Sequence, residues 1–358
     1  MIQDRMLKSK MLRYFLSRQW YAQLEVDILA KQRVTKARKL VTDIDVLALY
    51  SDVTGHFRTI IGDCKTQKGQ SPISRTLWMK GLMEYLYAEK GFIVLEKAVE
   101  KDHQLTSSTL DIHLLSEKDF DVFAAHTVPP GGISINSALV SMDNWDLLFG
   151  LPKKFPKMQE LYDFNKSDFW NEPQNNNRLR HAILSLKKVR TEVNPANNLH
   201  MAAVLNHISL MAIAVNDLIA NIFNRYLLPD SKQELDDDLK ILIWGGAENY
   251  NYLNDLRKRF SAQLSVDNDL SLPKWDQFLE FIRSTLENPL AFNLVPLYLK
   301  ENAFMYLTND LTLNYAKNLA SQNPYVVSFA IKITEYAVTA CELPKEIANE
   351  SSNRFLGL

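Results

Sequence analysis

Two segments of the sequence decide how the first part of the chain folds: Thr42-Asp43-Ile44-Asp45-Val46-Leu47-Ala48 and Ile60-Ile61-Gly62-Asp63-Cys64-Lys65. Both lie in longer runs, 41–50 and 57–65, that have the period of two expected of β-strands. Because side chains alternate along a strand, Asp45 lies on the same face as Asp43 and Leu47, and Asp63 on the same face as Lys65. A hairpin through the loop 51–56 would place Asp45 and Asp63 toward one end of a shared face.

The segments around this hairpin predict a mixed α/β domain. A helix with an apolar face is expected over Met6–Arg18, and a strand over Gln23–Leu29. A second helix is expected from Pro72, with Ser71 as its N-cap, followed by strands over 91–95 and 110–115. The predicted order is helix, three strands, helix and two further strands.

Paired carboxylates at the end of a hairpin call for a physical reason. Two ionised carboxylates about 4 Å apart repel each other by roughly 4 kcal/mol at an effective dielectric constant near 20. A divalent cation removes this cost, and Mg²⁺ prefers carboxylate and carbonyl oxygens. Lys65 would stand beside such an ion, where an ammonium can steady the charge that develops on a phosphate.

These residues resemble the PD-(D/E)XK nuclease superfamily, whose members have the restriction-endonuclease-like fold. The resemblance is carried by the Ile-Asp-Val-Leu-Ala strand, the next strand ending in Asp-Cys-Lys and the capped helix after it, and it covers about residues 5–125. Ile44 stands before Asp45 in place of the proline of the family motif. The resemblance implies a central mixed sheet and an Mg²⁺- or Mn²⁺-dependent hydrolysis of phosphodiester bonds, which we expect to act on DNA and to leave a 5′-phosphate.

The resemblance also implies a role for individual residues. Asp45 and Asp63 would be carboxylate ligands of the metal, the main-chain carbonyl of Cys64 a third ligand, and Lys65 the catalytic lysine. Gln67, just past the motif, and Glu25, on the preceding strand, are further candidates for the catalytic site. Asp43 is interpreted as a solvated residue or as one that supports the ligands, and not as a ligand itself.

Two other functions are compatible with the same residues. A catalytically inert relative would keep the three groups as a structural ion pair and bind nucleic acid or support a protein assembly. A nuclease acting on RNA is a third possibility, which the sequence does not separate from the DNA hypothesis.

Basic residues near these strands are candidates for contacts with the nucleic-acid backbone, because phosphate neutralisation dominates such binding. One group lies in a basic run and comprises Lys36, Arg38 and Lys39. Lys68 and Arg75 flank the start of the helix at Pro72, where a helix N-terminus favours anions. The alternative interpretation of both groups is ordinary solvated charge.

A compositional change near residue 130 predicts two domains. Residues 1–130 contain no asparagine and carry 19 basic and 16 acidic residues, whereas all 27 asparagines follow. The change coincides with Pro129-Pro130-Gly131-Gly132, which cannot continue a helix. We therefore expect a nuclease domain over 1–130 and an all-helical domain of unknown role over 131–358.

Helical patterns fill most of the second predicted domain. The expected segments are 178–193, 195–228, 235–244, 250–264, 275–287, 289–320 and 324–341. This domain is where we expect contacts with a partner protein or a second copy of the chain.

The overall composition fits a soluble protein. The formal net charge is −1, which excludes a polybasic protein, and the two cysteines form no CxxC pair. The most apolar window, 199–223, is broken by polar residues, so we expect a buried helix and no membrane partner. A cytoplasmic location is expected.

Overall fold

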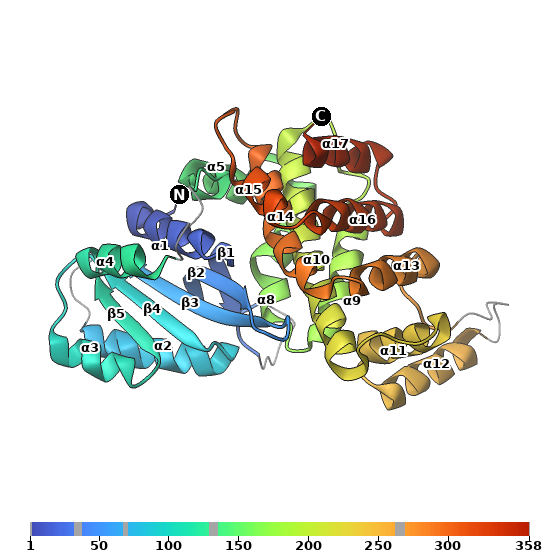
Figure 1. The fold of residues 1–358 in the computed structure, drawn as a ribbon, viewed down its shortest axis with the longest axis horizontal. Helices are drawn as coiled ribbons and strands as arrows, with labels where there is room; N and C mark the ends of the chain where they lie inside the picture. The colour runs from blue at the N-terminus through green and yellow to red at the C-terminus, as the bar shows by residue number, and fades with distance from the viewer. Residues whose placement is uncertain (1, 32–37, 67–70, 129–134, 262–268, 358) are drawn as a thin grey trace.

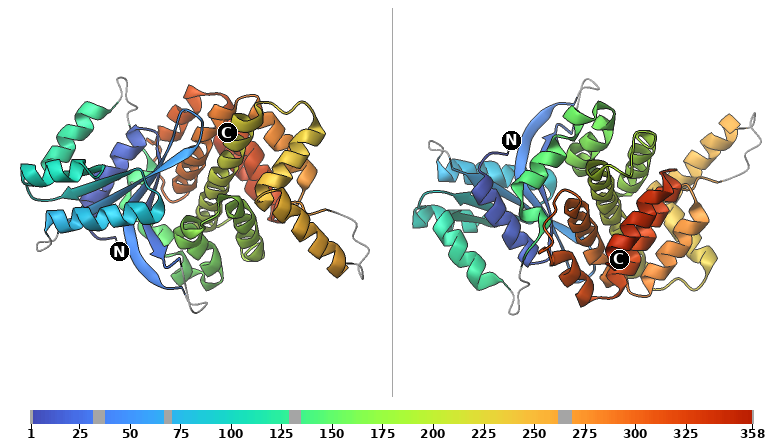
Figure 2. Two further views of the ribbon diagram at one scale, coloured as in Figure 1. Left: turned by 90° about the horizontal axis from the view of Figure 1, so that it is seen from below. Right: turned by 90° about the horizontal axis from the view of Figure 1, so that it is seen from above.

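The computed structural model describes residues 2–31, 38–66, 71–128, 135–261 and 269–357. The chain forms a five-stranded mixed sheet with flanking helices, followed by a larger helical part that lies beside it (Figures 1 and 2). The α/β and all-α composition expected from the sequence is therefore confirmed at this level.

The strands lie in the sheet in chain order. They are β1 (Tyr21–Leu29), β2 (Leu40–Ser51), β3 (Phe57–Lys65), β4 (Lys90–Leu95) and β5 (Ile112–Ser116). The first three strands are antiparallel, whereas β4 and β5 run parallel to β3 and are reached through crossover helices. The five predicted strands are confirmed, with ends displaced by up to two residues.

Helices cover both faces of the sheet (Figure 1). One face carries α1 (Arg5–Ser17) and α4 (Glu117–Thr127), and the other carries α2 (Pro72–Leu86) and α3 (Lys101–Ser108). The approach of α1 is close: a Cβ on Gly62 would lie 2.1 Å from Sδ of Met11. Gly91 plays the same role on the other face, where its missing side chain leaves room for Met79 of α2.

The helical part is built around one long buried helix, α10 (Asn198–Tyr226). Its other α-helices are α5 (Met142–Phe149), α6 (Leu151–Lys154), α7 (Gln159–Asp163), α8 (Phe169–Asn171), α9 (Asn175–Lys188), α11 (Lys232–Trp244), α12 (Ala247–Ser261), α13 (Trp275–Leu286), α14 (Val295–Met305), α15 (Tyr315–Gln322), α16 (Tyr325–Ala340) and α17 (Lys345–Leu356). Among the described residues, α10 is the helix long and apolar enough to cross a membrane, yet its apolar window is wholly buried. Such burial is expected of a core helix.

The prediction of one helix over 289–320 is wrong. A 3₁₀-helix (Pro289–Leu294) precedes α14, and a non-helical stretch separates α14 from α15. Pro296 lies in the first turn of α14, where its missing N–H costs nothing and favours a new helix start. In the stretch after α14, the carboxylate of Asp310 accepts hydrogen bonds from the amide and hydroxyl of Thr312, which forms a local turn in place of helix.

Sheet and helical part share a continuous buried core. The hydroxyl of Tyr315 donates to the carbonyl of Leu16 at 2.6 Å, and Lys300 of α14 reaches the side-chain oxygen of Gln23 on β1. The expected joint between two domains falls at 129–132, which lies outside the described residues, so the boundary at residue 130 stays a prediction.

Candidate active site

The hairpin of β2 and β3 brings the two predicted carboxylates together. The β2–β3 pairing ends at Val46 and Gly62. Asp45 and Asp63 are the next residues at this end of the two strands. At this point the carboxylate of Asp45 accepts a hydrogen bond from the amide of Cys64, at 2.7 Å. Beyond the end of the β2–β3 ladder, the side chain of Asp45 thus accepts the hydrogen bond of a backbone amide. This hydrogen bond fixes the carboxylate against β3.

Lys65 bridges the two carboxylates. Its Nζ lies 3.2 Å from Oδ2 of Asp45 and 3.7 Å from Oδ1 of Asp63. Both aspartates are only 3% exposed, whereas the side chain of Lys65 is 32% exposed. The three groups converge as the sequence predicts, and the lysine occupies the side of the cluster that faces solvent.

Arg75 of α2 holds the other side of Asp63. Its Nε donates to Oδ2 at 2.5 Å and its Nη2 donates to Oδ1, which is the two-pronged geometry typical of a guanidinium and a carboxylate. The guanidinium also lies over the ring of Trp78, 4.5 Å from its centre. Arg75 was expected to contact phosphate, and in this arrangement it binds a candidate metal ligand.

Lys8 of α1 is a member of the site that the sequence analysis missed. Its buried Nζ lies 2.9 Å from Oδ1 of Asp45 and 2.5 Å from Oε1 of Glu25. Glu25 has a φ of 54°, an unfavourable conformation for a strand residue other than glycine. Such strain is tolerated only where surrounding contacts hold it, and here the ion pair to Lys8 does so.

The sequence contained a signal for Lys8. Lys8, Met11, Leu12 and Phe15 have the spacing of one helical face, and the last three are apolar. A lysine on the apolar face of a helix is expected to need a buried acidic partner.

The charges in this cluster balance. Three cations, Lys8, Lys65 and Arg75, face three carboxylates, Glu25, Asp45 and Asp63. Since the cluster is neutral as described, a divalent cation would add two positive charges and would have to displace an amine or a guanidinium from the carboxylate oxygens.

The environment separates the proton affinities of the two aspartates. Burial alone would raise the pKa of Asp45, but Lys8 and Lys65 hold it below its ordinary value. Burial raises the pKa of Asp63, and although Arg75 opposes this, the neighbouring charge of Asp45 adds to it. Burial would lower the pKa of Lys65, but the two aspartates raise it above its ordinary value. Lys65 is therefore a charged ammonium at neutral pH.

Comparison with known protein families, curated proteins and solved structures finds no match to this chain. Among the described residues, no group of three or more His, Cys, Asp or Glu side chains is arranged to hold a metal ion. The side-chain oxygens that remain as candidate metal ligands are those of Asp45 and Asp63. The thiol of Cys64 is buried against Met11, and Cys64 pairs with Val94 in the β3–β4 ladder. The role of its main-chain carbonyl as a metal ligand stays a prediction.

The remaining predicted site residues differ in their surroundings. Arg38 forms ion pairs with Asp163 and Asp168 of the helical part, both at 2.5 Å, so in this arrangement its charge is neutralised. Lys39 is exposed, as expected of a residue that contacts a nucleic-acid backbone. Asp43 is also exposed, as expected of a solvated residue. Lys36, Gln67 and Lys68 lie outside the described residues.

Proposed function

We propose that the sheet part is a metal-dependent nuclease of the PD-(D/E)XK type that hydrolyses phosphodiester bonds in DNA. The observation that supports this most strongly is the contact of one lysine with two aspartates from neighbouring strands, at 3.2 and 3.7 Å. The order α1, β1, β2, β3, α2, β4 is also the order of elements that the resemblance implies. A soluble, cytoplasmic enzyme is part of the same proposal.

The oxygens of Asp45 and Asp63 would hold Mg²⁺ or Mn²⁺, with the carbonyl of Cys64 as a further ligand. Their chemistry fits, because Mg²⁺ is usually bound through one or two carboxylates and keeps several waters or substrate phosphates. The four carboxylate oxygens already contact positively charged nitrogens in this structure. A bound ion would supply a polarised phosphoryl oxygen and a water of lowered pKa.

Lys65 acts by its charge in this proposal. Because the two aspartates raise its pKa, the ammonium keeps its proton at neutral pH and does not serve as a general base. It orients the attacking water and stabilises the negative charge that develops on the phosphate. Its partly exposed position places it between the buried aspartates and the solvent side from which a substrate would approach.

Arg75 exchanges its partner in this proposal. While the two hydrogen bonds to Asp63 are present, the guanidinium occupies the oxygens that a metal would use. If Asp63 held a metal, Arg75 would be available for a phosphate oxygen, which guanidinium groups bind by the same paired geometry.

The test is cleavage by purified variants. Lys65→Met and Asp63→Asn are compared with wild type on supercoiled plasmid and on RNA of matched sequence, with Mg²⁺ or Mn²⁺. We expect both variants to lose at least roughly a hundredfold in rate, the scale on which positioned electrostatic groups act. Asp43→Asn is the matched control, because it removes an exposed carboxylate two residues from Asp45 on the same strand. Equal cleavage by all four proteins would end the nuclease assignment, and cleavage of RNA alone would change the substrate.

The charge balance of the site favours a second candidate function, an inert relative that binds nucleic acid or a protein. In such a protein Lys8, Lys65 and Arg75 would hold the carboxylates permanently. Thermal unfolding with EDTA or Mn²⁺ separates the two functions. A nuclease should show a metal-linked rise in Tm that disappears in Asp45→Asn, whereas an inert relative should show none.

A further inference from the structure

A pocket of about 660 Å³ lies at the junction between the sheet and the helical part. Its walls come from the β2–β3 hairpin, the C-terminal end of α2, α8, the start of α9 and the middle of α10. Arg75 and the candidate active site are at the opposite end of α2. Pockets of this volume between domains are where small ligands bind most often.

A buried carboxylate without a hydrogen bond lines this pocket. Asp217 of α10 is 8% exposed, and its carboxylate accepts no hydrogen bond from the residues that the structure describes. Burial raises its pKa to about 6, which the charge of Arg178 opposes. At neutral pH the group is therefore mostly ionised, and a charge this far buried is costly unless hydrogen-bond donors reach it.

Arg178 of α9 lines the same pocket and is also incompletely paired. Its Nε is shielded from solvent and has no hydrogen-bond partner among the described residues. Its Nη2 makes only a long contact, 3.4 Å, with the carbonyl of Glu172. Arg178 and Asp217 are near enough to influence each other's pKa, yet the described structure contains no ion pair between them. One molecule placed between them could accept from the guanidinium and donate to the carboxylate.

The walls of the pocket are aromatic, and its rim carries Lys31 and Arg58 beside Glu89. Phe57, Tyr85 and Trp170 contribute rings to the lining. At the rim, the ammonium of Lys31 lies over the rings of Tyr85 and Tyr87, at 4.3 and 4.7 Å from their centres. Flat aromatic surfaces favour a planar ring system, and rim cations favour a phosphate.

The other charged groups of the lining are satisfied. Arg58, the second rim cation, pairs with Asp52 at 2.8 Å and lies 3.5 Å from Glu89, and Glu172 pairs with His181 at 2.9 Å. Asp217 and Arg178 differ from these groups, because neither has an ion pair within the described chain, although the guanidinium of Arg178 lies 5.2 Å from the ring centre of Phe169.

We propose that the junction pocket binds a guanine nucleotide. Guanine presents two adjacent donors, N1–H and the N2 amino group, which match the two oxygens of Asp217. Its O6 and N7 accept hydrogen bonds, and arginine is the usual partner of these atoms. The phosphate would then lie toward Lys31 at the rim. Adenine is disfavoured, because its N1 is an acceptor and would face the carboxylate.

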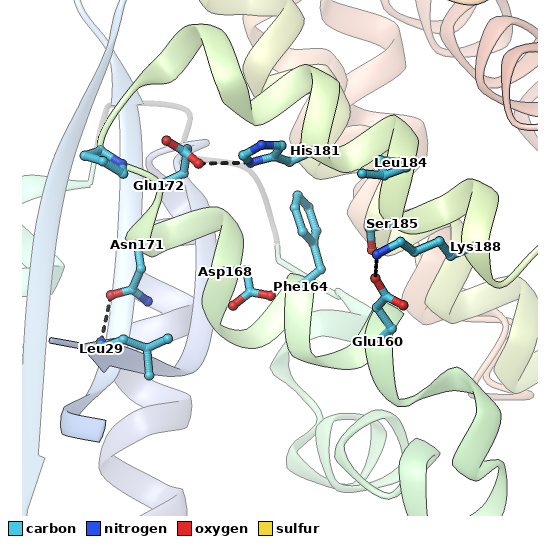
Figure 3. A pocket seen from close by; sticks show the side chains of 11 residues that line it. Leu29, Glu160, Phe164, Asp168, Asn171, Glu172, His181, Leu184, Ser185 and Lys188 are labelled. Atoms are coloured by element: carbon cyan, nitrogen blue, oxygen red, sulfur yellow. Dashed lines mark hydrogen bonds and ion pairs between the residues drawn. The ribbon is translucent and has the colours of Figure 1, made fainter. Parts of the chain in front are cut away.

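A second pocket, shown in Figure 3, shares Asn171 and Glu172 with the junction pocket and has a volume of about 370 Å³. Its charged groups are paired with one another: Glu172 with His181, and Glu160 with Lys188 at 2.5 Å. Asp168 is bound by Arg38. Each charged group of this pocket therefore has a partner within the described residues, although the buried hydroxyl of Ser185 has none, so the pocket supplies a control variant for the loss of a carboxylate charge.

The experiment is thermal unfolding and calorimetric titration of the full chain with GMP and GDP, in EDTA so that the active-site proposal does not enter. We expect both nucleotides to raise the Tm of wild type by several degrees, since a ligand that binds the folded state stabilises it. AMP and ADP should bind at least roughly tenfold more weakly.

The deciding variant is Asp217→Asn, which keeps the shape of the side chain and removes the buried charge. Its Tm without ligand should be no lower than that of wild type, while the shift caused by GMP is lost. Glu160→Gln, the same change in the neighbouring pocket, should retain the shift. The proposal is overturned if wild type does not respond to millimolar GMP or GDP, if AMP acts as strongly as GMP, or if Asp217→Asn responds like wild type.

Discussion

Two parallel hydrogen bonds join the guanidinium of Arg75 to the carboxylate of Asp63, across the boundary between α2 and β3. The pair closes the candidate metal site from one side, because both oxygens of Asp63 contact the arginine. Metal binding and this ion pair therefore compete for one carboxylate, and the competition can be measured.

Arg75→Gln is expected to weaken the metal-free protein and to increase its response to metal. Removing one partner of a largely buried pair should lower the free energy of unfolding by roughly 3 kcal/mol in EDTA. Asp63 is then free for a cation, so Mn²⁺ should raise the Tm of the variant by more than that of wild type. Thermal unfolding with and without Mn²⁺ measures both effects. An equal metal response in the two proteins would show that Arg75 does not occupy a metal site.

Lys8→Met is expected to leave Asp45 and Glu25 buried without their shared cation. The free energy of unfolding should fall by roughly 3–5 kcal/mol at pH 7, as measured by urea denaturation. In wild type, the lowered pKa of Asp45 stabilises the fold above its unfolded pKa, and this contribution is lost as the pH falls through the folded pKa. The variant lacks this contribution, so the difference between the two proteins should narrow as the pH falls below about 4, the ordinary pKa of an aspartate.

Lys10→Met is the control for this experiment. Lys10 lies on the same helix and pairs with Glu117 and Asp121, but it is more exposed. Its loss should cost less than about 1 kcal/mol. If both lysine variants lose the same free energy of unfolding, the buried ion pairs of Lys8 stabilise the fold no more than the more exposed pairs of Lys10 do.

Glu301→Gln tests a carboxyl group of α14 that is buried within the helical part, against Ser137 and Ala138. Burial raises the pKa of Glu301 to about 7, although hydrogen bonds from Ser137 and the amide of Ala138 oppose this. A raised acid pKa means that stability is full below the unfolded pKa and is lost as the pH rises through the folded pKa. The substitution removes this loss, so the variant should gain up to roughly 3 kcal/mol over wild type at pH 9 and little at pH 5.

Urea unfolding at the two pH values measures this difference, and Glu335→Gln, an exposed position on α16, is the control. A gain for Glu301→Gln that is the same at pH 5 and pH 9 would contradict the titration of Glu301 as its cause.

Gly62→Ala and Gly81→Ala should change stability in opposite directions. A Cβ at Gly62 would lie 2.1 Å from Sδ of the buried Met11 and 3.3 Å from the carbonyl oxygen of Val46, so overpacking should cost about 1–3 kcal/mol. A Cβ at Gly81 has no atom within 4 Å, and alanine favours the interior of α2 by about 0.5–1 kcal/mol. Chemical denaturation measures the sign of the change in the free energy of unfolding for each variant. A loss of stability in both would contradict this explanation from packing.

Local pattern was sufficient to predict the β2–β3 hairpin and the convergence of Asp45, Asp63 and Lys65. A period of two fixes which side chains share a face, and antiparallel pairing through a short loop then fixes which of them meet. The helix at Pro72 was predicted on similar local grounds, from Ser71 and the proline after it. These features depend on neighbours within about 25 residues along the chain.

Features that depend on packing between distant segments were not predicted. Lys8 meets Asp45 because α1 lies on the sheet where Gly62 leaves room for Met11, and no local pattern reports that crossing. The helix over 289–320 was wrong because local turn chemistry at Asp310 outweighed a helical apolar pattern.

The sequence by itself determined the strand pattern, the change in composition near residue 130 and the identity of the three groups that could carry the chemistry. Tertiary structure alone decided that the two aspartates among these groups are paired with Lys8 and Arg75, and that Asp217 and Arg178 line one pocket with rings from the sheet part. The physical reason is that secondary structure follows from periodic local interactions, whereas the burial and pairing of a charge depend on which remote surfaces pack around it.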